Sequence, residues 1–136
     1  MTREELQPEW ERIVDTGFSN YKKLTKAERV WFNVEPIITG GIVDHYINYG
    51  AEYNSDTIAD LETLNFTKVA DLLRKINSLF PKGKPSKDID KRAEQMEDWD
   101  EKHEDLLEDI DDEFWDMSDE LENQLELFIN ESKIGK

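Results

Sequence analysis

The residues best suited to chemistry in this sequence are two histidines, each with an aspartate close by in the chain. His45 directly follows Asp44, and His103 comes three residues after Asp100. On a helix the second spacing brings a carboxylate and an imidazole to one face, as in carboxylate-bridged metal bundles. Those bundles need two Glu-x-x-His motifs and further glutamates, and no second motif occurs here. We therefore expect both histidines to be structural.

Other catalytic and ligand-binding patterns are also missing from the sequence. The chain has no cysteine, and it has no Gly-x-Ser-x-Gly turn for a nucleophilic serine. The acids between Asp109 and Glu113 lack the glycine that an EF-hand calcium loop needs at its sixth position. Gly40 and Gly41 are not followed by the Lys and Ser or Thr of a phosphate-binding loop. We expect a protein that is not an enzyme and that needs no cofactor and no metal.

The acidic residues are concentrated at one end of the chain. Residues 88–136 contain 20 acids and 5 bases, whereas residues 1–87 contain 13 acids and 12 bases. Such an uneven field attracts basic surfaces and repels nucleic acid and anionic lipid. We therefore expect a cationic protein as partner, with no direct binding of nucleic acid and no association with a membrane.

The acidic segment has the apolar periodicity of a helix, which argues against a disordered tail. Apolar residues and one histidine follow one another there at steps of three and four: Ile89, Ala93, Met96, Trp99, His103, Leu106, Ile110, Phe114, Met117, Leu121, Leu125 and Phe128. One helix from residue 94 to residue 126 would be about 48 Å long, which exceeds the expected globule. We expect a break with Ser118 as the N-cap of the next helix.

The face opposite this apolar stripe is the candidate binding site. The candidate partner-binding residues are Glu94, Glu97, Asp98, Glu101, Glu104, Asp105, Glu108, Asp111, Asp112, Trp115, Asp116 and Asp119. Carboxylates at helical spacing recur every ~5 to 6 Å, whereas one DNA strand places phosphates about 3.4 Å apart. Two adjacent stripes, or a second copy in a dimer, would approach the charge density of a duplex. The alternative is a plain solvated face. Trp115 is either an anchor for a partner or a side chain covered by another helix.

The pattern of the first 80 residues predicts several shorter helices and no strand. Thr2 with Glu5, or Gln7 ahead of Pro8, can open a first helix, which we expect to end at Gly17.

Thr25 and Glu28 form a capping box for a second helix, which Pro36 then disturbs. Short helices follow Gly41 and Asn54, and a Leu-rich helix continues to Phe80.

The whole chain, residues 1–136, is expected to form a single all-helical domain. Residues 81–87 form a basic surface loop by composition, and the acidic helices of residues 88–131 then dock on the first 80 residues. No apolar run approaches a membrane span, and the amino terminus lacks the core of a signal peptide. Together with the absence of cysteine, this favours a cytoplasmic protein.

Several segments between about residue 22 and residue 131 share a pattern with one known family. The matching residues are Ala27, Glu28, Arg29, Val30, Trp31, Gly40, Gly41, Ile42, Val43, Asp44, His45, Tyr46, Ile47, Asn48, Tyr49, Gly50, Phe80, Pro81, Phe114, Trp115, Leu121 and Phe128. They resemble the bacterial domain-of-unknown-function family that includes DNA mimic protein 19. Thr39 and Ile42 differ from the Asn and Phe of that family's Asn-Gly-Gly-Phe segment.

The resemblance implies an all-helical fold without recognised catalytic residues, and DNA mimicry, often as a dimer, directed at a helix-turn-helix regulator. We therefore expect an all-α, compact multi-helix single domain with long acidic C-terminal helices. Its expected function is to bind a basic DNA-binding protein in competition with DNA. The alternative is an immunity protein or antitoxin that neutralises a cationic nuclease toxin.

Overall fold

Helices account for all the regular secondary structure of residues 2–134, the part of the chain that the computed structural model describes. The N-terminal helices are α1 (Gln7–Asn20), α2 (Lys26–Gly40), α3 (Ile42–Ile47), α4 (Asn54–Thr63) and α5 (Thr67–Asn77). The C-terminal helices are α6 (Ile89–Gln95), α7 (Trp99–Lys102), α8 (Glu104–Trp115) and α9 (Ser118–Glu131). Single 3₁₀ turns form at Tyr21–Lys23, Tyr49–Tyr53 and Pro81–Gly83. The expected all-α fold is confirmed.

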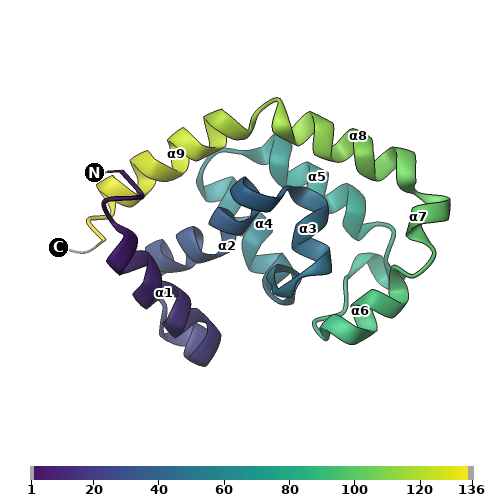
Figure 1. The fold of residues 1–136 in the computed structure, drawn as a ribbon, viewed down its shortest axis with the longest axis horizontal. Helices are drawn as coiled ribbons and strands as arrows, with labels where there is room; N and C mark the ends of the chain where they lie inside the picture. Colours follow the sequence, from purple (N-terminus) through teal and green to yellow (C-terminus); the bar gives the residue numbers. More distant parts are fainter. Residues whose placement is uncertain (1, 135–136) are drawn as a thin grey trace.

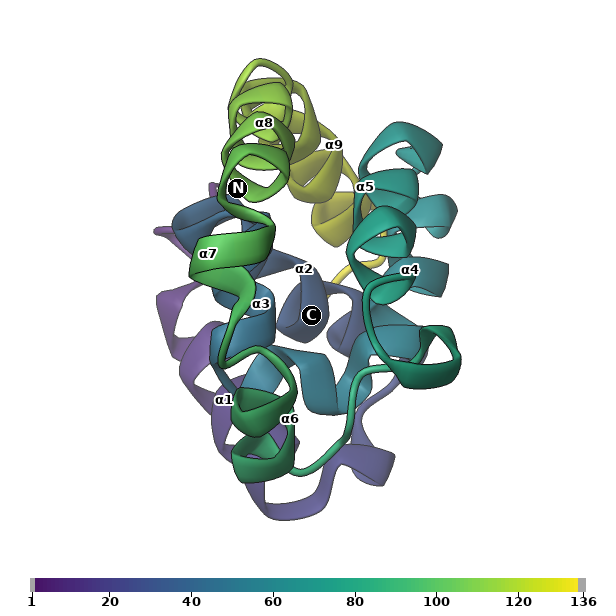
Figure 2. The ribbon, with the colours of Figure 1, turned by 90° about the vertical axis from the view of Figure 1, so that its right-hand side faces the viewer.

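Helix α2 lies at the centre of the fold and contacts α1, α3, α4 and α9. The acidic C-terminal helices dock on this N-terminal part, as the sequence predicts: α6 contacts α3, α8 contacts α3 and α5, and α9 contacts α2. Figure 1 shows α8 and α9 following each other along one long edge of the molecule. Figure 2 shows α6 and α7 beside α3 at one end. Within residues 2–134, no helix combines the length and the apolarity needed to cross a membrane.

The first helix does not end at Gly17, so that prediction is wrong. Helix α1 begins at Gln7, directly before Pro8, and continues to Asn20. Gly17 is buried, and a Cβ there would overlap the ring of Phe32. This glycine is therefore present because α1 packs closely on α2, a contact that the local sequence does not reveal.

The capping box of the second helix is confirmed. The Thr25 hydroxyl accepts a hydrogen bond from the Glu28 N–H (3.2 Å), and the Glu28 carboxylate accepts one from the Thr25 N–H (2.9 Å). Pro36 lies inside α2, which nevertheless continues to Gly40. Gly41 then breaks the chain with a φ of +90°, a conformation that favours glycine.

The acidic segment breaks more often than the sequence predicts. Helix α8 ends at Trp115 and α9 begins at Ser118, so the expected break is at the right place. Its mechanism differs, because the Ser118 hydroxyl donates to the Trp115 carbonyl (3.1 Å) and does not cap α9. Further breaks occur at residues 96–98 and at His103.

These breaks reset the helical phase, and the buried stripe shifts with it. The buried residues of the acidic segment are Arg92, Trp99, Leu107, Ile110, Phe114, Leu121, Leu125 and Ile129. Leu107 replaces the predicted Leu106, which is exposed, and Ile129 replaces Phe128, which is half-buried. The apolar stripe thus exists, but it runs over several short helices and not along one straight helix.

Candidate functional site: an acidic surface on α6 to α9

Most of the candidate carboxylates are exposed to water. Nine of them are exposed and form no ion pair with any residue between 2 and 134: Glu94, Glu97, Glu101, Glu104, Asp105, Glu108, Asp112, Asp116 and Asp119. We call these nine residues the acidic surface. They extend from α6 to the first turn of α9, so they follow the edge formed by α8 and the start of α9 (Figure 1).

Asp98 has a different environment from the nine residues of the acidic surface. The Lys102 ammonium lies 2.7 Å from the Asp98 carboxylate, and this hydrogen bond lowers the pKa of Asp98. The pair joins the turn before α7 to the end of α7, and both side chains are exposed. Lys102 therefore offsets the charge of one candidate carboxylate.

Asp111 is used inside the molecule. Its Oδ1 accepts hydrogen bonds from the N–H groups of Ile42 (2.8 Å) and Val43 (3.2 Å) at the start of α3. These donors have no partner within their own helix, and a carboxylate is favourable at a helix N-terminus. A Cβ on Gly41 would lie 3.2 Å from this oxygen and 3.0 Å from the Trp115 ring. Gly41 and Asp111 thus join α8 to α3.

Trp115 is only partly covered. Its ring lies against Gly41 and packs beside Phe114 with ring centroids 5.0 Å apart. It remains 46% exposed. The ring therefore helps to close the contact between α8 and α3, and nearly half of the side chain faces water, so its role as an anchor for a partner stays a prediction.

Arg92 anchors α6, and sequence reasoning missed it. Its side chain is completely buried and donates to the carbonyl oxygens of Tyr46 (2.8 Å), Asn48 (2.5 Å) and Ser86 (2.7 Å). Two of these carbonyls belong to the end of α3 and the residue after it, where a cation is favourable. Burial lowers the pKa of this guanidinium. The steps of four and three from Arg92 to Met96 and Trp99 were a usable signal.

Trp99 fixes the turn that leads into α8. It is buried against Phe80, with ring centroids 4.7 Å apart, and the half-buried ring of His103 meets it edge-on at 5.8 Å. Helix α7 is therefore tied to the end of the segment that follows α5. The acidic surface rests on a packed support rather than on a loose loop.

His45 belongs to a buried network of polar side chains. Its Nε2 lies 3.1 Å from the Asn54 amide nitrogen, and Asn54 also donates to the Tyr46 hydroxyl (3.3 Å). That hydroxyl donates to Asn77 (2.7 Å), whose amide donates back to Asn54 (2.8 Å). Burial lowers the pKa of His45 to about 3, with a smaller contribution from Arg92. His45 is thus held neutral as part of the fold.

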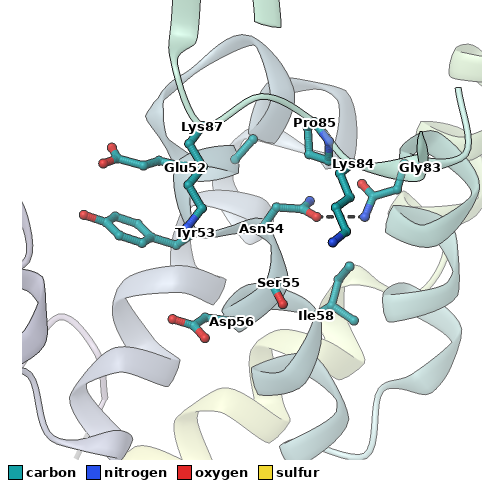
Figure 3. A pocket seen from close by; sticks show the side chains of 12 residues that line it. Glu52, Tyr53, Asn54, Ser55, Asp56, Ile58, Gly83, Lys84, Pro85 and Lys87 are labelled. Atoms are coloured by element: carbon teal, nitrogen blue, oxygen red, sulfur yellow. Dashed lines mark hydrogen bonds between the residues drawn. The ribbon is translucent and has the colours of Figure 1, made fainter. Parts of the chain in front are cut away.

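One cavity lies away from the acidic surface, between the start of α4 and the loop of residues 83–87. It has a volume of about 490 Å³. Figure 3 shows Lys84 and Lys87 extending from the loop toward the start of α4. Asn54, at the start of that helix, accepts a hydrogen bond from Asn77. Ser55 supplies a hydroxyl, but the described residues that line the cavity include no histidine to activate it. The residues present therefore do not form a nucleophile and base pair.

Metal binding also lacks a prepared site in the described chain. Across residues 2–134, the His, Asp and Glu side chains do not gather in any group of three or more that could hold a metal ion. The acidic side chains on α8 diverge around the helix, whereas calcium ligands must converge on one point.

Comparison with known proteins gives one informative result. Neither the curated proteins nor the solved structures contain a match to this chain. A family model described as DMP19-like protein matches residues 22–132, which include α2 to α9 and almost the same segment on which the sequence resemblance rests. The chain therefore belongs to the DMP19-like protein family.

Proposed function

We propose that this protein is a non-enzymatic DNA mimic, whose acidic surface binds a basic DNA-binding protein in competition with DNA. The observation that supports this most strongly is the state of the nine carboxylates of the acidic surface, which are exposed and without ion pairs among residues 2–134. Unpaired carboxylates on a folded support present negative charge to a partner, much as phosphates do. A helix-turn-helix regulator is the expected class of target.

The dimensions of the acidic edge suit a DNA-binding groove. Helix α8 has 12 residues and α9 has 14, so at 1.5 Å per residue they extend about 18 Å and about 21 Å. Their sum is close to one turn of DNA, roughly 34 to 36 Å. Helix α8 itself carries seven carboxylates and no base. A groove that follows one turn of duplex would therefore meet unpaired carboxylates along α8 and the first turn of α9, whereas Glu122 and Glu126 further along α9 pair with Arg3.

The support under the acidic surface also favours binding. Asp111 joins α8 to α3, Arg92 joins α6 to α3, and Trp99 holds α7 against Phe80. Charges that are already in place need little reordering when a partner arrives, so less binding free energy is lost. This preorganisation distinguishes the acidic surface from a flexible acidic tail.

The test is competition with DNA. The full-length protein is immobilised at about 50 mM NaCl, incubated with extract of its source organism, and eluted with duplex DNA. The eluted protein is then purified, and its Kd for the mimic is measured up to about 200 mM NaCl. We expect a DNA-binding protein that is released by duplex and whose affinity falls steeply with salt. A partner that duplex does not displace would contradict DNA mimicry.

The same measurement separates the alternative function. An immunity protein or antitoxin would retain a cationic nuclease and inhibit its cleavage of DNA at equimolar concentration. A transcription regulator without nuclease activity, displaced by its own operator, agrees with the proposed function. Recovery of an inhibited nuclease would replace it with the alternative.

A further inference from the structure

An apolar groove opens beside the acidic surface, among α3, α6, α7 and α8. Its volume is about 250 Å³. Its apolar lining comes mainly from Val43, Ile47, Ala93, Met96, Trp99 and Leu107. Figure 2 shows these helices side by side, with α6 and α7 next to α3. The groove is distinct from the polar cavity of Figure 3, which lies between α4 and the loop before α6.

The groove has a buried floor and open walls. Trp99 and Leu107 are nearly completely buried and form part of the floor. Ile47, at the end of α3, is 58% exposed and forms part of the open wall. Ile47 thus extends the apolar lining of the groove to the protein surface.

The charged side chain that lines the groove is acidic. Asp100 is the charged residue among those that line it. Glu97 directly follows the lining residue Met96, and Glu108 directly follows Leu107, and both belong to the acidic surface. The nearby Lys102 is already paired with Asp98. An approaching basic segment is therefore attracted to the rim, while the hollow itself favours an apolar side chain.

We propose that this groove receives one apolar side chain, aliphatic or aromatic, from the basic protein that the acidic surface attracts. This inference rests on the proposed function and adds a structural feature that DNA lacks. An apolar cavity of roughly 150 Å³ accommodates a benzene ring, so the groove has room for one large side chain. Interfaces commonly combine such a central anchor with a charged rim. The partner's segment carries Leu, Met, Phe or Trp between Lys and Arg residues.

The groove gives the acidic surface selectivity. Charge alone attracts every basic protein, and its contribution falls with salt. Burial of an apolar side chain is almost independent of salt and favours only those partners that present one at the right position. The two contributions can therefore be separated by measuring affinity as a function of ionic strength.

The experiment uses two synthetic helical peptides of about 15 residues, long enough to populate a helix. Both carry lysines on one face, and they differ at a single central position, which is Phe in one and Ala in the other. Their Kd values are measured on the full-length protein and on Ile47→Gln and Ala93→Gln, two exposed groove positions. Leu127→Gln is the matched control, because Leu127 is 56% exposed on α9 and lies outside the groove.

We expect the Phe peptide to bind about tenfold more tightly than the Ala peptide, as for an anchor residue. Either groove variant removes this preference, Leu127→Gln retains it, and the salt dependence stays the same in all four proteins. If both peptides bind with equal affinity, the groove does not receive the central side chain and this inference is wrong. The proposed role of the acidic surface would then still stand. Failure of both peptides to bind at low salt would overturn the proposed function as well.

Discussion

The two parts of this chain use their charges in opposite ways. In residues 2–87 the arginines pair with carboxylates of their own helix or of neighbouring segments: Arg3 with Glu35, Arg12 with Glu9 and Glu28, Arg29 with Asp56 and Asp60, and Arg74 with Glu62 and Asp71. In residues 88–134 the described pair is Lys102 with Asp98, while Arg3 reaches across to Glu122 and Glu126.

The nine carboxylates of the acidic surface form no ion pair with residues 2–134, so ion pairing there adds little to the stability of the fold. In residues 88–134 the packing comes from the apolar stripe, from the buried Arg92 and from the Asp111 contact with α3. Charges that do not hold the fold remain available for association. The difference between the regions can be tested by substitutions that should matter in one region and not in the other.

The largest expected effect is the loss of the ion pair between Arg29 of α2 and Asp60 of α4. Arg29 donates to both oxygens of the completely buried Asp60 (2.5 and 3.2 Å). Arg29→Ala leaves that carboxylate buried without its cation, which costs about 3 kcal/mol of unfolding free energy. Urea unfolding measures this loss. The control is Lys102→Ala, which removes an exposed pair and is expected to leave the midpoint unchanged. Similar urea midpoints for the two variants would show that the two regions do not differ in how much their ion pairs stabilise the fold.

The next effect is a pH dependence of the unfolding free energy, which originates in residues 2–87. Burial disfavours the charged form of His45 and lowers its pKa from the ordinary 6.5 to about 3 in the folded protein. As pH falls below 6.5, the unfolded chain binds a proton that the folded chain does not, so stability is lost. This costs about 2 kcal/mol between pH 8 and pH 5.

The pH effect is isolated by comparing the wild type with His45→Gln, since both retain every carboxylate. Unfolding free energies are measured by urea titration at several pH values. We expect the wild type to lose about 2 kcal/mol more than the variant between pH 8 and pH 5. Parallel pH profiles would show that His45 is not held neutral in the folded protein.

A smaller effect separates two neighbouring aspartates within the acidic region. Asp111→Ala removes two hydrogen bonds to the start of α3 and should cost about 1 to 2 kcal/mol. Asp112→Ala removes an exposed carboxylate without an ion pair and should leave stability unchanged. Thermal unfolding of the two variants checks this contrast. Equal destabilisation would mean that the acidic surface also stabilises the fold.

Local chemistry explains which features of the fold the sequence predicts. The Thr25 and Glu28 capping box and the break at Ser118 depend on residues within one turn of each other. Arg92 and Gly17 depend on contacts with distant segments, since Arg92 binds carbonyls 44 and 46 residues away. The end of α1 could not be predicted, because Gly17 packs on the distant ring of Phe32, whereas the helical spacing of Arg92 with Met96 and Trp99 was a signal for the anchor of α6.

The candidate site shows the same limit. Helical periodicity correctly separated exposed carboxylates from the buried stripe for most of α8, because the period depends only on local geometry. It could not separate Asp111 from Asp112, since the difference lies in the α3 N–H groups 69 and 68 residues away in sequence. The apolar groove was also missed, because it is assembled from α3 and from three helices beyond residue 88.

The proposed function requires that the carboxylates of the acidic surface, rather than net charge alone, bind the partner. The direct test compares two triple variants of equal charge: Glu104→Gln, Glu108→Gln and Asp112→Asn on α8, and Glu4→Gln, Glu11→Gln and Asp15→Asn near α1. Binding of the purified DNA-binding partner is measured against salt concentration. We predict that the α8 variant binds weakly, with a salt slope smaller by up to about one per removed charge, while the α1 variant behaves as wild type. Equal losses in both variants would contradict the account.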